Sequence, residues 1–202
     1  MNEAIYSGNK ALLEKALNIL DWSLELGWDK QYGGFIYFTD IDGRPCEQLE
    51  WDMKLWWVHN EALIATLLAY GLTGEKKYFD MFEKVHAYAF GHFADKEYGE
   101  WYGYLHKDGT VSHTQKGSMW KGPFHHPRCL MNCDKILSLL ADGKPMEYLG
   151  TVTISAAEAG VSLDTDAAVE AAYNYGRTKF LIFSRLKNKT LAERKYAGGF
   201  RR

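Results

Sequence analysis

Two short segments of this chain combine residue types that bind sugars with residue types that move protons. They are residues 50–61 (EWDMKLWWVHNE) and residues 120–128 (WKGPFHHPR). Aromatic rings stack on the apolar C–H faces of sugars, while charged groups hydrogen-bond to hydroxyls. A histidine titrates near neutral pH and can donate or accept a proton. The two segments therefore suit acid–base chemistry on a carbohydrate, although a large-residue core is the ordinary use of aromatic residues.

The elements that must position these segments repeat along the chain. Residues 29–35 (DKQYGGF) match residues 95–101 (DKEYGEW), an offset of 66. The dipeptides at 42–43 and 108–109, both Asp-Gly, match at the same offset, as do His59 and His125. Self-similarity at a fixed period indicates stacked structural units.

Each repeat is predicted to hold two helices joined by a Gly- and Tyr-rich segment. Apolar residues at three- and four-residue steps predict the first helix of each repeat: Leu13, Ala16, Leu17, Leu20 and Leu24, then Phe79, Phe82, Val85, Ala89 and Phe93. The second helices are expected to begin near Leu55 and Pro123. Their expected inward faces are Ala62, Leu63, Ala65, Thr66 and Ala69, then Cys129, Leu130, Cys133, Ile136, Leu137 and Leu140.

The linking segments are expected to form short β-hairpins with tight turns at the Asp-Gly pairs. His59 and His125 would both stand at the start of an inner helix, where the helix dipole disfavours extra positive charge by about 1 kcal/mol. The pattern predicts an all-α domain of helical hairpins over residues 1–142. Two hairpins alone leave helical faces uncovered, so a homodimer or a partner chain is one expectation for the open flank.

Residues 143–202 differ in composition and form an unassigned basic tail, with ten Lys/Arg against six Asp/Glu. Residues 163–175 could form a helix, and the tail could instead be partly disordered. A solvated end is favoured over polyanion binding.

The overall composition excludes several function classes. The formal charge of -2 gives no support for nucleic-acid binding, and no apolar run is long enough to span a membrane. Cys46, Cys129 and Cys133 lack metal-ligand spacing and predict free thiols. The free thiols, and an N-terminus without the basic and apolar pattern of a signal peptide, together predict a cytoplasmic protein. No phosphate-binding loop or metal-ligand pattern is present, so we expect no cofactor.

Three stretches resemble the N-acylglucosamine 2-epimerase family, which includes the renin-binding protein, cellobiose 2-epimerases and aldose–ketose isomerases. They are residues 49–57, 97–105 and 121–129, within a resemblance that runs from about Leu12 to Leu140. The resemblance implies part of an (α/α)6 toroid. It also implies epimerisation at C2 of a reducing sugar, most simply N-acetylglucosamine to N-acetylmannosamine, with two histidines sharing the proton transfer.

By position, the resemblance implies that His125 is one catalytic acid/base. Trp57 and Trp120 would be stacking platforms, while Glu61 would bind hydroxyls or orient His125. Arg128 would bind an oxygen near the reacting carbon, and His59 is grouped with the substrate-binding residues although a structural role is favoured for it.

The chain also departs from the family pattern. The family's Gly-His-x-x-Glu motif has no match in residues 1–10, so the resemblance is to the C-terminal half of an epimerase, and we expect weak or absent activity. Two alternatives stay open. One is a non-catalytic helical module that binds carbohydrate or protein. The other is a toroid of the glycoside hydrolase type, which would use carboxylates such as Glu50, Asp52 and Glu100.

Overall fold

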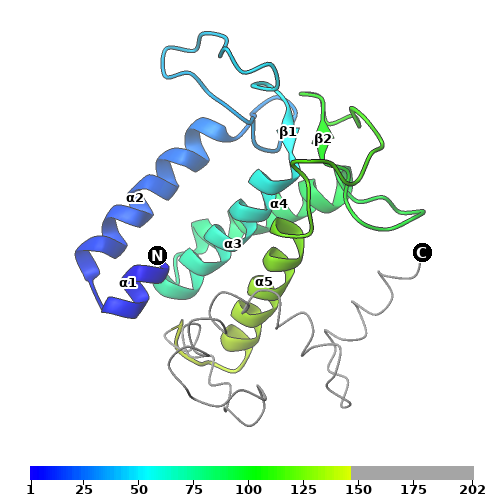
Figure 1. Cartoon of the computed structure of the whole chain (residues 1–202). Coiled ribbons are helices and arrows are strands. Elements are labelled where there is room, and N and C mark those ends of the chain that lie inside the picture. The colour runs from blue at the N-terminus through cyan, green and yellow to red at the C-terminus, as the bar shows by residue number, and fades with distance from the viewer. Residues whose placement is uncertain (147–202) are drawn as a thin grey trace, which may run out of the picture. The chain divides into compact units, whose positions relative to one another are not determined.

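The computed structural model describes residues 1–146, so the predicted helix at 163–175 and most of the basic tail lie outside the described residues. The elements in chain order are α1 (Asn2–Ser7), α2 (Lys10–Gly27), β1 (Lys54–Leu55), α3 (Trp56–Thr73), α4 (Lys76–His92), β2 (Tyr104–Leu105) and α5 (His125–Ala141) (Figure 1). The four long helices confirm the helical periodicity of the sequence.

Helix α3 is the centre of the described fold because it packs against both α4 and α5. Its side chains are apolar around most of its circumference, as expected for a helix covered on several sides. Gly74 ends α3 in the left-handed conformation, with φ of 70°, which costs a glycine little. Asn9 begins α2 by accepting a hydrogen bond from the backbone N–H of Leu12 at 3.1 Å.

The expected inward face of α5 needs one correction. Leu137 is 42% exposed, whereas Leu139, which the periodicity did not select, is buried. Cys129 and Ile136 are buried as expected. Leu139 and Ile136 join Leu67 and Leu68 of α3 in one apolar cluster. The contact line therefore follows residues 129, 136 and 139.

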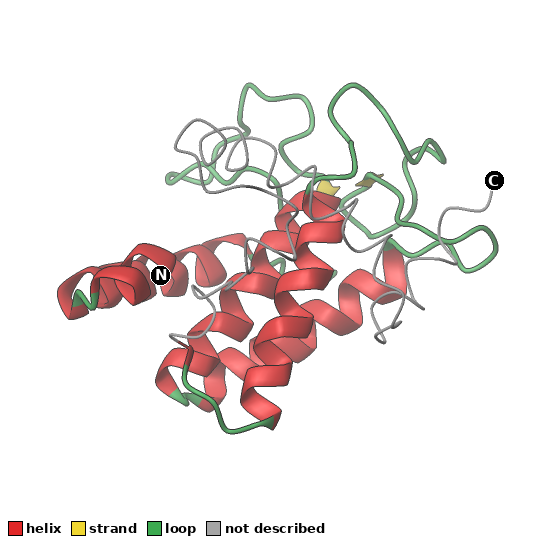
Figure 2. Cartoon of the chain, turned by 60° about the horizontal axis from the view of Figure 1, so that its bottom comes forward, coloured by secondary structure: helices red, strands yellow, loops and turns green. Residues whose placement is uncertain are grey.

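The long loops and both strands gather at one end of the helices (Figure 2). The Asp-Gly turns form as predicted, with positive φ at Gly43 and Gly109. A short hairpin forms around Asp108-Gly109, where Leu105 and Val111 make an antiparallel bridge, and the backbone of residues 37–38 bonds to that of residues 51–53 in the first repeat. In addition, β1 pairs antiparallel with β2 and so joins the two repeats. Trp56 extends this contact by donating its backbone N–H to the carbonyl of Gly103 at 3.0 Å. This pairing ties the start of α3 to the second repeat.

The turn after each outer helix is built in the same way in both repeats. Asp29 Oδ1 accepts the backbone N–H groups of Gln31 and Tyr32, at 2.9 and 3.3 Å. Asp95 Oδ1 accepts those of Glu97 and Tyr98, at 2.9 and 3.2 Å. The backbone bridges Trp28–Phe35 and Ala94–Trp101 also correspond at the offset of 66.

The two turns differ at one position, and this difference predicts a stability effect. Gly34 has φ of +72°, and an added Cβ would lie 2.4 Å from the Tyr88 ring. We expect Gly34→Ala to destabilise the fold by about 2 kcal/mol or more, from left-handed strain and overpacking. A shift in the denaturant midpoint would measure it.

The matched control is Gly99→Ala, in the corresponding turn of the second repeat. Gly99 has φ of +72°, but an added Cβ there would meet no atom within 4 Å, so this change adds left-handed strain without a steric conflict. A loss for Gly99→Ala as large as that for Gly34→Ala would contradict the steric argument.

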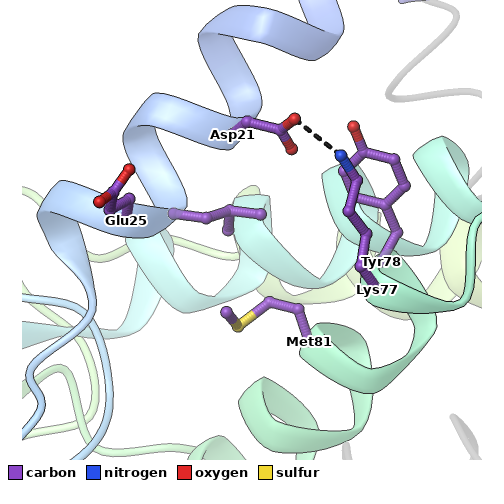
Figure 3. Close-up of a pocket in the computed structure, with 6 residues that line it drawn as sticks. Asp21, Glu25, Lys77, Tyr78 and Met81 are labelled. Atoms are coloured by element: carbon purple, nitrogen blue, oxygen red, sulfur yellow. Dashed lines mark hydrogen bonds and ion pairs between the residues drawn. The ribbon is translucent and has the colours of Figure 1, made fainter.

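Helix α2 lies at the periphery of the described fold. A hollow of about 280 Å³ separates it from α4, with Asp21 and Lys77 joined across it at 2.8 Å (Figure 3). Ile19, Trp22 and Leu26 recur on one side of α2 and are about 60% exposed, at 59%, 64% and 59%. An apolar stripe of this kind is typical of surfaces that contact other protein segments. Within residues 1–146, no helix has the length and hydropathy needed to cross a bilayer.

Candidate active site

Three polar side chains converge between the first two turns of α3 and the first turn of α5. Glu61 Oε1 accepts a hydrogen bond from His125 Nδ1 at 2.8 Å and another from Arg128 Nη2. His125 and Arg128 lie about one helical turn apart, so both reach the same carboxylate across the helix interface. The side chains of His125, Glu61 and Arg128 are 29%, 37% and 36% exposed, so a small molecule can reach them.

The carboxylate of Glu61 sets the chemistry of this cluster. Partial burial acts to raise the pKa of Glu61, but hydrogen bonds from Arg128 and His125 outweigh it and lower that pKa. Glu61 is therefore ionised at neutral pH and favours the tautomer in which His125 carries its proton on Nδ1. The other ring nitrogen, Nε2, then has the lone pair that accepts a proton.

Aromatic rings surround the imidazole of His125. The Trp57 ring lies 5.6 Å from it at 36°, and the Trp56 ring lies 6.4 Å from it, edge to face. Phe124 contacts His125 at 5.0 Å and also lies under the guanidinium of Arg128 at 5.1 Å. The Tyr37 ring packs edge to face against Trp57, with ring centres 5.8 Å apart. Trp57 is thus placed directly beside the imidazole of His125.

Trp120 lines a separate hollow, and its ring is not packed against that of His125. Its side chain is 76% exposed and borders a cavity of about 310 Å³. The other lining residues are Glu50, Met53, Tyr104, Ser112, His113 and Ser118. The loop before Trp120 is held in place by Lys121, whose Nζ donates to both carboxylate oxygens of Glu100, at 2.8 and 2.6 Å.

His59 lies outside this cluster. It is 0% exposed, and both ring nitrogens are engaged within the fold. Nδ1 donates to the carbonyl of Leu55 at 2.8 Å, and Nε2 accepts the backbone N–H of Phe35 at 3.0 Å. Because both of its ring nitrogens are engaged, His59 has none to offer a substrate and is not part of the candidate site. Its structural role is to join the first turn to the start of α3.

His126, rather than His125, occupies the place in the second repeat that His59 has in the first. The His59 ring packs on Phe35, and the His126 ring packs at 4.2 Å on Trp101, the repeat equivalent of Phe35. His126 Nδ1 also donates to Asn60 Oδ1 at 3.1 Å, and Asn60 Nδ2 donates to the Trp56 carbonyl at 3.0 Å. His59 and His126 are thus structural equivalents although they are 67 residues apart, whereas the turns of the two repeats match at 66.

Buried His59 predicts a pH dependence of stability. Burial lowers its pKa from 6.5 to about 4, with Lys54 acting in the same direction and the Leu55 carbonyl opposing. Between these pKa values the unfolded chain binds more protons, so stability rises with pH across this window and falls on acidification. We expect His59 to account for a loss of about 3 kcal/mol by pH 4, from the shift in its pKa.

Denaturant unfolding at a series of pH values from 7 to 4 would measure this loss. His59→Gln should flatten the dependence in part, since burial also lowers the pKa of His126 to about 4. His106→Asn, an exposed change, should leave it intact. An unchanged slope in His59→Gln would contradict the assignment.

The sequence did not single out Asn60 and Trp56, which link α3 to the histidines at the start of α5. The available signal for Asn60 was its position beside Glu61 near the start of an apolar helix. Among residues 1–146, three buried side-chain atoms have no hydrogen-bond partner: Arg128 Nε, Trp56 Nε1 and Tyr88 Oη. Buried donors are usually paired, and Arg128 Nε is the one that belongs to the cluster around Glu61.

Of the carboxylates considered for glycoside hydrolysis, Glu100 is engaged by Lys121, and Glu50 lines the hollow beside Trp120. In the described part of the chain, no group of three or more His, Cys, Asp or Glu side chains could hold a metal ion. The arrangement around His125 instead suits proton transfer beside an aromatic platform.

Comparison with known proteins agrees with this type of fold. A profile of the N-acylglucosamine 2-epimerase family matches residues 3–129, which is more than half of the chain. The chain belongs to this family, whose characteristic fold is an (α/α)6 toroid. A solved structure described as a D-mannose isomerase is similar, with a TM-score of 0.58 and 24% identity. The match covers 67% of this chain and 34% of that chain.

Two mammalian relatives are N-acylglucosamine 2-epimerases. The mouse protein (Mus musculus) is 52% identical over 114 residues, and the bovine protein (Bos taurus) is 50% identical over 126 residues. These matches cover 56% and 62% of this chain but 27% and 30% of those proteins. The chain therefore spans less than a third of the length of these relatives.

Proposed function

We propose that this chain carries one acid–base half of a sugar 2-epimerase site, of the type that converts N-acetylglucosamine to N-acetylmannosamine. The observation that carries the proposal is the contact of His125 Nδ1 with the Glu61 carboxylate beside Trp57. In the proposed mechanism the sugar ring opens, His125 Nε2 removes the C2 proton, and an enediol-type intermediate forms. Arg128 stabilises the developing oxygen charge, and Trp57 and Trp120 hold the sugar.

We also propose that this chain holds only one of the two acid–base groups of the site. Epimerisation by two bases needs one acid–base group on each face of C2. Of the histidines near the cluster, His59 and His126 are held by contacts within the fold, so His125 is the candidate with access to substrate. One base can remove a proton and return another to the same face, which exchanges hydrogen without inverting C2.

Incubation of the purified chain with N-acetylglucosamine in heavy water tests this proposal. We expect deuterium at C2 of N-acetylglucosamine, read by proton NMR, with much less N-acetylmannosamine. Epimer formed as fast as deuterium enters would overturn the one-base proposal. Binding of the sugar without exchange would overturn catalysis and support a carbohydrate-binding module. If the sugar neither binds nor exchanges hydrogen, the proposed sugar site is overturned.

A second candidate is a module that is covered by another protein surface. The exposed stripe of Ile19, Trp22 and Leu26 on α2 favours it, because an apolar flank of this kind is unfavourable in water. A homodimer or a partner chain would cover the stripe. Light scattering of the native chain and of Trp22→Glu separates the cases: a dimer lost in the variant supports self-association, and a monomer for both overturns it.

We also propose a cytoplasmic location. Its support is that Cys46, Cys129 and Cys133 are all free thiols, as is usual in a reducing compartment.

A further inference from the structure

Two of the three cysteines in the sequence lie next to each other on α5. The sulfur atoms of Cys129 and Cys133 are 3.9 Å apart, in an S–H···S contact. Cys129 is buried and Cys133 is partly exposed. The third cysteine, Cys46, is a single thiol in the loop before β1. The chain thus holds one close pair of thiols and one separate thiol.

The geometry of α5 disfavours a direct disulfide between the pair. Side chains one helical turn apart have Cβ atoms about 5–6 Å apart. A disulfide needs Cβ atoms about 3.5–4.5 Å apart, with sulfurs about 2 Å apart. An inserted atom bonded to both sulfurs at about 2.3 Å, a length typical of zinc–thiolate bonds, can join sulfurs up to about 4.6 Å apart. The observed separation therefore fits a bridging atom without unwinding the helix.

The number of ligands decides which bridging atom suits the pair. Among the described residues, no third His, Cys, Asp or Glu completes a metal site around these sulfurs, whereas a structural zinc ion takes four ligands. A monosubstituted trivalent arsenical carries its own carbon substituent and needs only two sulfurs. We propose that Cys129 and Cys133 form a dithiol site for trivalent arsenicals of the R–As(OH)₂ class.

The binding step needs no oxidant. Two As–OH bonds and two S–H bonds break, two As–S bonds form, and two water molecules leave, so arsenic stays trivalent. The hydrogen bond with Cys133, together with burial, raises the pKa of the Cys129 thiol. Attack therefore starts at the more accessible Cys133, and Cys129 closes the ring once the first As–S bond holds the arsenic beside it.

Phenylarsine oxide, whose hydrate belongs to this class, tests the site in the native full chain. One equivalent is added in the presence of excess glutathione, which competes for arsenic held by single thiols. Intact-mass spectrometry should show one phenylarsenic per chain, removed by 2,3-dimercaptopropanol. Trypsin cuts after Arg128 and Lys135, so one peptide (CLMNCDK) holds both cysteines and Cys46 falls in another. The adduct is expected on the two-cysteine peptide.

Matched variants complete the test. Cys133→Ser and Cys129→Ser should each lose at least ten-fold in glutathione-resistant adduct, and Cys46→Ser should retain it. If Cys129→Ser fails to fold, the Cys133→Ser result and the peptide map of the native chain still decide. An adduct on the Cys46 peptide, retention in Cys133→Ser, or no resistant adduct on the native chain would each overturn the proposal. None of these outcomes depends on epimerase activity.

Discussion

His125→Asn should lower the rate of deuterium exchange at C2 of N-acetylglucosamine by about 10²–10⁴-fold, the contribution typical of one general acid–base group. Asparagine keeps a polar side chain of similar reach but has no basic ring nitrogen to accept a proton. The Glu61 carboxylate then remains paired with Arg128 but no longer orients a base. The rate relative to wild type at saturating sugar is the measurement.

The control is His106→Asn, in an exposed turn of the second repeat. It should leave the exchange rate within about two-fold of wild type, since surface changes away from a site have small effects. Circular dichroism should match for both variants. If His125→Asn exchanges as fast as His106→Asn, then His125 is not the base.

Asp29→Ala should destabilise the fold by about 3–5 kcal/mol, because it leaves a buried charge without its partner. Lys54 is 0% exposed, and its Nζ donates to Asp29 Oδ2 at 2.6 Å and to the carbonyl of Gly33 at 2.7 Å. Burial opposes the charge on both groups, yet hydrogen bonds to Lys54 and the backbone lower the pKa of Asp29. A fall in the denaturant midpoint at pH 7 measures the loss.

The second repeat supplies the control, Asp95→Ala. Asp95 makes the same two backbone contacts, but its cation Lys116 is 26% exposed and can be rehydrated when the carboxylate is removed. The loss should therefore be clearly smaller than for Asp29→Ala. Asp29→Ala combined with Lys54→Met should recover part of the stability, because the unpaired charge is gone. Equal losses in both single variants would refute the buried-charge argument.

The local pattern of the chain predicted much of the fold. Apolar spacing identified α2, α3, α4 and α5 because helical periodicity depends on neighbours in sequence. The repeat of Asp29 at Asp95 was visible because a turn that uses one carboxylate to accept two backbone N–H groups needs the same residue each time. The Asp-Gly turns were predictable because positive φ is cheap for glycine.

Pairing between distant segments was not predictable in the same way. The β1–β2 contact joins residues about fifty apart, and nothing local in residues 54–55 or 104–105 specifies the partner. The burial of Leu139 in place of Leu137 depends on the angle at which α5 crosses α3, which two neighbouring surfaces decide together.

The histidines mark the boundary between what the residues and the tertiary structure determine. The sequence by itself determined that imidazole, indole, carboxylate and guanidinium groups occur at the starts of two inner helices. The resemblance implied that Glu61 could orient His125, and the tertiary structure shows why this imidazole, and not that of His126, faces the carboxylate. Consecutive residues of a helix with 3.6 residues per turn point about 100° apart. That rotation places His125 against Glu61 and Trp57, while His126 turns to Asn60 and Trp101.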